Sequence, residues 1–323
     1  MNYQQVLLNT MTQYDPANVY HIVSVSSGVP SALTAIHVIN KYHGVSPIEL
    51  VFADTLAEDE DNYRFLDDLE TYTGYKITRI CDGRTPLDIM VEQSVVFTQV
   101  FAPCTRILKL EPIFNHVKNI QEQGYQVVMH IGYDLGDKAR GRLDSTTRNW
   151  ASKDCIVQYP LIDALVVDPL SEIKRLGITP PRSYDMGFKH ANCLGQGGCV
   201  KFGQSDMIKT YNLFPDRYAY RERIETSIRK KQAITAMVNS IIVSLLFGVI
   251  VPVEGKLYAH VRDTTNESGQ VTLKQLRERY EHAKSQTPQQ LSFFELSVDL
   301  FEDCSKECGV TSQSAWETVL EAE

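Results

Sequence analysis

The chain has 323 residues, of which 43 % are apolar and 22 % charged, so it can build a sizeable core in one large domain or two smaller ones. Its formal net charge of −8 argues against a protein that coats duplex nucleic acid, although a local basic cleft stays open. The segment 1–20 has no basic stretch followed by an apolar run, so no signal peptide is expected there. Seven cysteines, an odd number, indicate the reducing cytoplasm.

The first half of the chain alternates short apolar stretches with amphipathic ones, which are typical of buried strands and of helices. We expect strands at 21–26, 48–54, 75–81, 125–132 and 155–162, and helices at 31–44, 62–74, 86–94 and 109–124. This order predicts an α/β fold, with a parallel twisted sheet and helices on both faces. Ligands of such sheets bind at the carboxyl ends of the strands.

Beyond Pro169 the pattern becomes mostly helical, with a loop rich in glycine and cysteine and helices expected at 205–214 and 218–232. The most apolar stretch, 240–253, is too short to span a membrane and is closed by a proline, so we expect a buried helix or strand. Three parts are predicted: an α/β nucleotide-binding domain, a cysteine loop with helices that complete the site, and a mostly helical C-terminal region without an assigned role. They cover residues 1–170, 171–235 and 236–323.

The stretch VSVSSGVPSAL, at 23–33, is typical of a strand that ends in small residues and continues as a helix. The junction consists of Ser26, Ser27, Gly28 and Ser31 around Pro30. Small residues let backbone amides approach a ligand closely, and the helix that follows points its positive end at the same place. The pattern favours phosphate binding. An ordinary turn with proline at the first helical position is the alternative.

Two further polar pairs follow expected strands or helices. Asp54 and Thr55 end the second strand, where the alternative for Asp54 is a helix N-cap. Arg106 and Lys109 are three residues apart, so one helical face can present both to phosphate or sulfate oxygens. A solvated basic face is the alternative for this pair.

Several segments of the sequence, taken in chain order, together resemble a known protein family. They are SVSSGVPSA, VFADTLAEDEDNYRFLDDLE, CTRILKLEPI, HIGYDLGDKAR, YPLID and NCLGQGGCVKFG. Together, over residues 20–232, they resemble the phosphoadenosine-phosphosulfate-reductase-like branch of the PP-loop ATP pyrophosphatase superfamily. The stand-alone members found in bacteriophage and bacterial genomes are the most similar. The resemblance implies a fold of the adenine-nucleotide α-hydrolase type.

It also implies roles for individual residues. The nucleotide would be bound by Ser24, Ser26, Ser27, Gly28, Ser31, Asp54, Thr55, Asp137 and Arg142, and the catalytic residues would be Arg106, Lys109 and Arg140. Outside the family context, surface salt bridges would explain Asp137, Arg140 and Arg142 equally well. Two positions depart from the family pattern: Pro30 stands where adenylating members carry an acid, and Leu56 stands where glycine is common.

Cysteines supply a second candidate site. Cys193 and Cys199 lie in the glycine-rich loop, and Cys104 precedes the TRILK segment. Thiolates in such a loop can hold an iron–sulfur cluster or zinc, and the resemblance implies that the three recur together. A redox pair and a purely structural loop are the alternatives. Cys81 and Cys155 are expected to be buried small hydrophobic residues.

The tail contains ECGV at 307–310, which resembles the late cysteine motif of phosphoadenosine-phosphosulfate reductases. Cys308 would match the nucleophile, but Thr311 stands where that motif has histidine. The alternative is a helix that Gly309 ends and a second helix that Thr311 caps.

The predicted function is therefore that of an enzyme that binds ATP or a related adenine nucleotide with Mg²⁺ and cleaves the bond between the α- and β-phosphates. This would activate an acceptor for sulfur transfer or for modification of a nucleotide or nucleic acid. The alternatives are a sulfonucleotide reductase that uses Cys308 and a non-catalytic nucleotide-sensing or modification-complex subunit. The expected partners are the nucleotide, its acceptor and further copies of the chain in a homo-oligomer, without a membrane.

Overall fold

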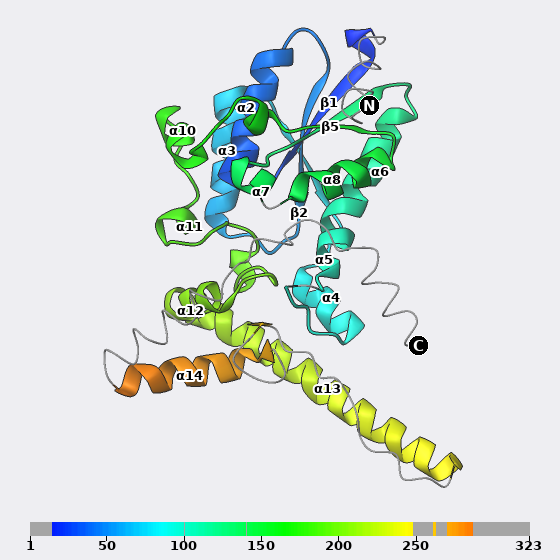
Figure 1. The fold of residues 1–323 in the computed structure, drawn as a ribbon, viewed down its shortest axis with the longest axis vertical. Helices are drawn as coiled ribbons and strands as arrows, with labels where there is room; N and C mark the ends of the chain where they lie inside the picture. Colours follow the sequence, from blue (N-terminus) through cyan, green and yellow to red (C-terminus); the bar gives the residue numbers. More distant parts are fainter. Residues whose placement is uncertain (1–14, 100, 140, 248–260, 263–269, 287–323) are drawn as a thin grey trace. The chain divides into compact units, whose positions relative to one another are not determined.

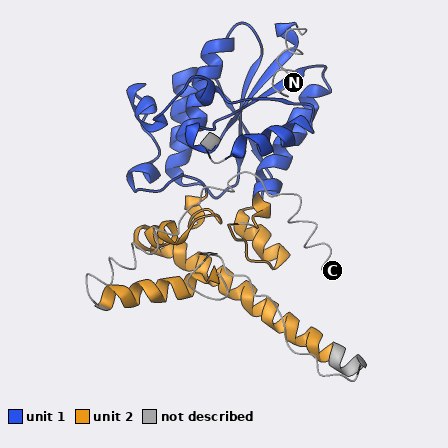
Figure 2. Cartoon of the chain, in the orientation of Figure 1, with its two compact units in different colours: residues 1–83, 105–192 blue, residues 84–104, 193–323 orange. Residues whose placement is uncertain are grey.

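The computed structural model describes residues 15–99, 101–139, 141–247, 261–262 and 270–286. Proximity of Cα atoms groups the chain into two compact units, shown in Figure 2. Unit 1 contains residues 1–83 and 105–192, and unit 2 contains residues 84–104 and 193–323. These units are groups of neighbouring residues, and the three domain ranges expected from the sequence stay a prediction.

Unit 1 is built on a parallel sheet of five strands in the order β3-β2-β1-β4-β5 (Figure 1). The strands are β1 (Val19–Val25), β2 (Ile48–Asp54), β3 (Ile77–Cys81), β4 (Gln126–Ile131) and β5 (Ile156–Gln158). The predicted α/β class with a parallel sheet is confirmed. β5 is shorter than expected because Pro160 begins a helix, α9 (Pro160–Asp163). The strand order changes direction between β1 and β4, and ligands of open parallel sheets bind at such a switch point.

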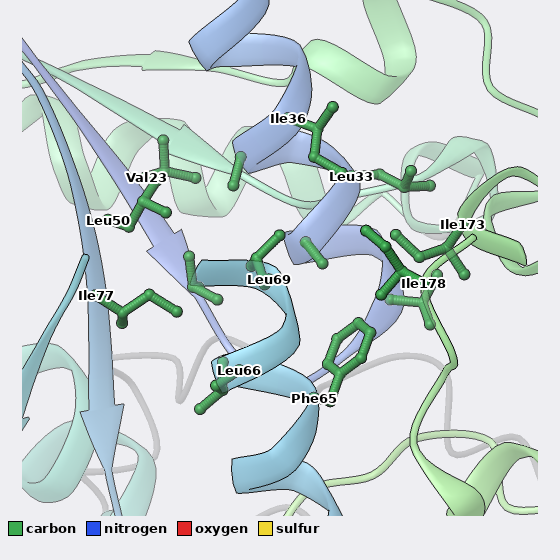
Figure 3. Packing of buried hydrophobic residues seen from close by; sticks show 14 of the residues in the cluster. Val23, Leu33, Ile36, Leu50, Phe65, Leu66, Leu69, Ile77, Ile173 and Ile178 are labelled. Atoms are coloured by element: carbon green, nitrogen blue, oxygen red, sulfur yellow. The ribbon is translucent and has the colours of Figure 1, made fainter. Parts of the chain in front are cut away.

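Helices cover both faces of this sheet. On one face, α2 (Val29–Tyr42) and α3 (Glu60–Thr73) pack against β1, β2 and β3, together with residues in and after α10 (Pro169–Arg175). Figure 3 shows this core, with Val23, Leu50 and Ile77 from the strands and Leu33, Ile36, Phe65, Leu66, Leu69, Ile173 and Ile178 around them. The other face is covered by α6 (Glu111–Gln121) and α8 (Arg142–Ala151), which bury Val117 and Trp150 on Ile22 and Met129.

Short elements complete unit 1. They are η1 (Pro16–Asn18), the π-helical turn η2 (Arg106–Leu110), α7 (Leu135–Ala139) and α11 (Arg182–Asp185). Helix α3 shows how local sequence sets its bounds: the Asp59 side chain accepts from Asp61 N at its start, and Gly74 ends it with φ of 72°. A left-handed conformation at a helix end favours glycine, as the sequence pattern expected here.

Unit 2 consists mainly of helices. They are α4 (Pro86–Gln93), α12 (Gln204–Leu213), α13 (Pro215–Phe247) and α14 (Leu273–Gln286), with η3 (Leu194–Gln196) and the antiparallel pair β6 (Val261–Arg262) and β7 (Gln270–Val271). The short α5 (Pro103–Thr105) ends the first segment of this unit. Helix α14 is tied to α13 by Leu273 N, which donates to Glu225 Oε2 at 2.8 Å, and by the Arg277–Glu222 ion pair at 2.9 Å.

The apolar stretch 240–253 was expected to be buried, and the structure differs from this prediction at two residues. Its first part continues α13 to Phe247, and Ile241 and Ile242 are 49 % and 47 % exposed, so the predicted burial is wrong for these two residues. Ser240 is buried, and residues 248–253 lie outside the described part. Within that part, no helix is both long enough and apolar enough to cross a membrane.

Candidate functional site

The serine loop, residues 26–31, joins β1 to α2 and curls around the Ser31 side chain. Ser26 N donates to Ser31 Oγ at 2.9 Å, and Ser31 Oγ lies 2.8 Å from the Gly28 carbonyl, to which it donates. Gly28 occupies the N-cap position of α2 and has no side chain that could accept from the first turn. The positive end of α2 lies at this loop, as the helix ends that bind phosphate groups do in other proteins.

Two features of this loop have no explanation within the chain. Gly28 has a φ of −97°, which any residue can adopt, and a Cβ built on it would come no closer than 3.5 Å to another atom, Tyr184 Oη. Neither conformation nor crowding requires glycine there. The Ser27 hydroxyl is fully buried and has no hydrogen-bond partner. Both features fit a loop whose missing neighbour is a ligand.

Residues distant in sequence complete the surroundings of the loop. Val29 N donates to Tyr184 Oη at 3.1 Å, and burial raises the pKa of this tyrosine above its usual value. Gly132 follows β4, and a Cβ on it would lie 2.6 Å from Ser31 Cα, so only glycine allows the two segments to meet. Sequence reasoning did not single out Tyr184 or Gly132, because each lies about a hundred residues or more from the loop. Ser24 lies within β1, paired in register with Val51 and Ile131.

Asp54 ends β2 and holds the turn that follows it. Its Oδ1 accepts from Leu56 N at 2.9 Å and from Tyr63 Oη at 2.8 Å. The N-cap of α3 is Asp59, so the structure does not use Asp54 in that way. Leu56 has a φ of 55°, in the left-handed region. This explains why glycine is the easier residue at this position.

Lys109 reaches the same strand end. Its Nζ lies 3.9 Å from Glu58 Oε1, and the same carboxylate accepts from Thr55 Oγ1 at 3.2 Å. Glu58 is buried, and its second oxygen accepts from Asn62. Glu58 was missed by the sequence analysis. Its position, four residues after Asp54 in an acidic run, resembles a solvated surface.

Arg106 and Lys109 lie near different carboxylates, Glu111 and Glu58. Arg106 pairs with Glu111, and both side chains are more than 40 % exposed. The cause is the π-helical turn at 106–110, since a spacing of three residues places side chains on one face only in an α-helix. The joint phosphate clamp formed by Arg106 and Lys109 stays a prediction.

The segment after β4 brings Asp137 and Arg142 together as a largely buried ion pair. The Arg142 guanidinium also lies over the Tyr133 ring, 4.5 Å from its centroid. This pair is more than a surface salt bridge, because the two side chains are only 9 % and 15 % exposed. Arg140 lies outside the described residues.

The three candidate metal ligands belong to unit 2 and gather around a residue that the sequence analysis did not consider. Arg221, in α13, is 1 % exposed, and burial lowers its pKa to about 10. Negative charge on Cys199, Cys193 and Cys104 would act on this guanidinium and raise that pKa again. Its Nη1 donates to the carbonyls of Gly197, at 2.9 Å, and Gly198, whereas Nε and Nη2 have no hydrogen-bond partner.

The glycines of the cysteine loop are required by the chain itself. A Cβ on Gly197 would lie 2.8 Å from the Arg217 carbonyl oxygen, and one on Gly198 would lie 2.4 Å from the Phe202 ring. Both glycines have positive φ, as does Cys193 with 58°. The loop also holds Cys199 through Lys201 N, which lies 3.4 Å from its sulfur and donates to it.

Thiolates such as those of Cys104, Cys193 and Cys199 are suitable donors for a soft metal. Across the described residues, no group of three or more His, Cys, Asp or Glu side chains is placed to hold a metal ion. The iron–sulfur cluster or zinc stays a prediction and supports no chemical step here. Cys155 is buried as expected, which raises its pKa to about 12. Cys81 is exposed, so its predicted burial is wrong: β3 is an edge strand and Cys81 is its last residue. Cys308 lies outside the described part.

Comparison with solved structures finds a distant likeness. The chain is similar to a phosphoadenylyl-sulfate (PAPS) reductase from Candida auris, solved as a phosphate complex, with 14 % sequence identity and a TM-score of 0.36. The match covers 58 % of this chain and 85 % of that one. No family model matches the sequence, and no curated protein does so either. A likeness of this degree assigns neither a family nor an activity.

Proposed function

We propose that this chain is an enzyme that binds an adenine nucleotide through the serine loop and cleaves the bond between the α- and β-phosphates. The observation that carries the proposal is the unpartnered, fully buried hydroxyl of Ser27, which lies next to the start of α2. A phosphate group would accept from that hydroxyl, and the positive end of α2 would favour its charge.

Charged residues of unit 1 support the second half of the proposal. Lys109 Nζ lies 3.9 Å from Glu58, which follows β2, and Arg142 follows β4, so a cation lies after each of the two strands that flank β1. Both are held by carboxylates, Glu58 and Asp137. Their role would be to neutralise phosphate charge as it develops, with positioning supplying most of the rate. A Mg²⁺ ion would add to that neutralisation when bound with the nucleotide.

Calorimetry with ATP on the full chain tests the binding step. Ser27→Ala should weaken ATP binding about tenfold, since a hydrogen bond to a charged group contributes about 1.5 to 3 kcal/mol. Gly28→Val should abolish it, because the side chain would occupy the space in front of the loop while its backbone conformation stays allowed. The matched control is Ser183→Ala, which removes another buried hydroxyl without a partner. Unchanged ATP affinity in Ser27→Ala and Gly28→Val would overturn the assignment of the loop.

Release of pyrophosphate from ATP tests the reaction. The acceptor is proposed to be a nucleotide or nucleic acid, so turnover is measured with and without each, and with PAPS as the alternative substrate. Sulfite release from PAPS that is lost in Cys308→Ser would favour the sulfonucleotide reductase instead. Tight ATP binding without any turnover would favour the non-catalytic subunit. The oligomeric state is read from light scattering on the same sample.

The metal predicted at Cys104, Cys193 and Cys199 is tested by purification without oxygen and metal analysis. Each serine substitution should remove a similar amount of bound metal, whereas Cys81→Ser and Cys155→Ser should leave it in place. Protein without metal under those conditions would leave the redox pair or the structural loop as the explanation of these cysteines.

A further inference from the structure

The core of unit 1 contains a pair of histidines where aliphatic residues would be expected. His21, on β1, and His130, on the neighbouring β4, are 1 % and 0 % exposed. His21 Nδ1 and His130 Nε2 lie 2.9 Å apart, so one of the two rings donates to the other. Tyr42, near the end of α2, stacks on His21 with ring centroids 3.8 Å apart and planes inclined by 19°. The sequence analysis gave neither histidine a role.

Burial disfavours the charged form of both imidazoles. Burial lowers the pKa of His21 to about 4, and it lowers that of His130 well below its usual value; the nearby Lys41 charge acts in the same direction. The hydrogen bond between the rings uses His130 Nε2. His130 Nδ1 is buried and has no hydrogen-bond partner. An unsatisfied buried group of this kind costs about 1 to 3 kcal/mol.

That nitrogen belongs to a residue that lines a cavity of about 350 Å³. The cavity lies within unit 1, between the second half of α2, the ends of β4 and β5, and α9. Its polar lining comes from His37, Asn40, Lys41, Tyr42, His130, Gln158 and Asp163. No residue of the serine loop lines it. A single water would occupy about 30 Å³, so the space exceeds what one water needs to satisfy His130.

The charges around the cavity select the class of ligand. Burial disfavours the charged form of the His130 imidazole, so this residue adds no positive charge to the lining. Lys41 and Asp163 carry opposite charges, so the lining favours neither sign. Asn40 and Gln158 offer amide groups, and Tyr42 Oη lies 3.3 Å from Gln158 Oε1, to which it donates. Amides, an imidazole and an aromatic ring are the groups that recognise the edge of a heterocyclic base.

We propose that this cavity binds an uncharged nitrogen heterocycle of nucleobase size, which hydrogen-bonds to His130 Nδ1. The volume lies at the lower end of the range for small-molecule sites, about 300 to 1,000 Å³, and suits one or two fused rings. Since the neutral imidazole can place its proton on either nitrogen, the ligand supplies the complementary donor or acceptor. The site is separate from the nucleotide site proposed above and does not depend on it.

The test uses the full chain with adenine, hypoxanthine, cytosine and uracil as free bases. We expect at least one of them to bind by calorimetry and to shift the ¹⁵N resonance of His130 Nδ1. His130→Leu should weaken that binding at least tenfold, whereas His43→Leu, which changes an exposed histidine at the end of α2, should not. Gln158→Met provides a second variant with the same expected loss should His130→Leu fail to fold.

Competition with ATP distinguishes this site from the serine loop. Base binding should persist in Ser27→Ala and in the presence of saturating ATP, and ATP binding should persist in His130→Leu. Absence of binding by all four bases at millimolar concentration would overturn the proposal. Displacement of the base by ATP, or equal affinity in the wild type, His130→Leu and Gln158→Met, would do the same.

Discussion

The serine loop of unit 1 and the cysteine loop of unit 2 are both rich in small residues, but they need their glycines for different reasons. At Gly28 the backbone conformation is ordinary and a Cβ would meet nothing closer than 3.5 Å. At Gly198 the φ is 94° and a Cβ would lie 2.4 Å from Phe202. The first glycine leaves space open, and the second permits close packing of the chain on itself.

The comparison extends to the polar groups beside each loop. Both loops have buried polar atoms without a hydrogen-bond partner: Ser27 Oγ at the serine loop, and Gln196 Oε1 and two nitrogens of Arg221 at the cysteine loop, so these atoms do not distinguish the loops. The glycines do distinguish them, because a glycine-rich segment indicates a ligand only where the chain itself gives the glycine no reason to be there. By this measure the serine loop is the stronger candidate of the two.

Substitution of each of these two glycines by alanine tests the difference between the loops most directly. Gly198→Ala should reduce the free energy of unfolding by about 4 kcal/mol, from the unfavourable left-handed conformation and the collision with Phe202. Gly28→Ala should change it by less than about 1 kcal/mol. Chemical denaturation measures both. Similar losses in the two variants would show that the loops do not differ as described.

The two units should respond differently to acid, because the basic side chains that they bury differ in pKa. The pKa of His21 is about 4 in the folded chain against 6.5 when exposed, so the unfolded state binds an extra proton as the pH falls through this interval. Unfolding of unit 1 should therefore become easier by up to about 3 kcal/mol between pH 7 and pH 4. Arg221, with a pKa of about 10, stays charged throughout and adds no such dependence to unit 2.

Hydrogen exchange followed on peptides of β1 and β4, and separately of α13, measures this difference. His21→Leu should reduce the pH dependence of exchange in β1 and β4 and leave exchange in α13 unchanged. His43→Leu should leave the pH dependence in the strands as it is in the wild type. A dependence that survives removal of His21 would assign the acid sensitivity to other groups.

The smallest expected effect concerns a residue that adopts a glycine-like conformation without being glycine. Leu56, with φ of 55°, is 46 % exposed, so Leu56→Gly should relieve strain and stabilise the chain by about 0.5 kcal/mol. Leu165, with φ of 52° and 70 % exposed, is the matched control and should respond in the same way. Thermal unfolding compares them. A loss of stability in Leu56→Gly alone would mean that the leucine side chain makes a contact the turn needs.

Much of the fold could be predicted from the sequence because its signals are local. Apolar runs such as that of β1 and stop residues such as Gly74 act within a few positions, and the parallel sheet follows from their alternation. The π-helical turn at 106–110 could not be predicted in this way, and it separates Arg106 from Lys109. The exposure of Ile241 and Ile242 was missed because hydropathy cannot tell a buried face from an unpartnered one.

The candidate sites show the same limit. The serine loop is contiguous, so its pattern is visible in eleven letters of sequence, at 23–33. Tyr184, Glu58, His130 and Arg221 act through partners on other elements, and a lone residue of each type is common on any surface. Only three-dimensional proximity reveals that they are buried and that some of their atoms lack a partner.

The division of the chain into units has a consequence for its synthesis. Polypeptide passes from one unit to the other three times, after residues 83, 104 and 192. Residues 84–104 thus leave the ribosome well before residue 193, where the rest of their unit begins. At about 5 to 20 residues per second, this segment waits on the order of ten seconds for its partners. During that interval unit 1 can close around its own sheet, whereas α4, with Leu87, Ile89 and Met90 on its apolar side, has no completed core to join. Nascent-chain protection of these residues, for example by a chaperone, would be confined to that period.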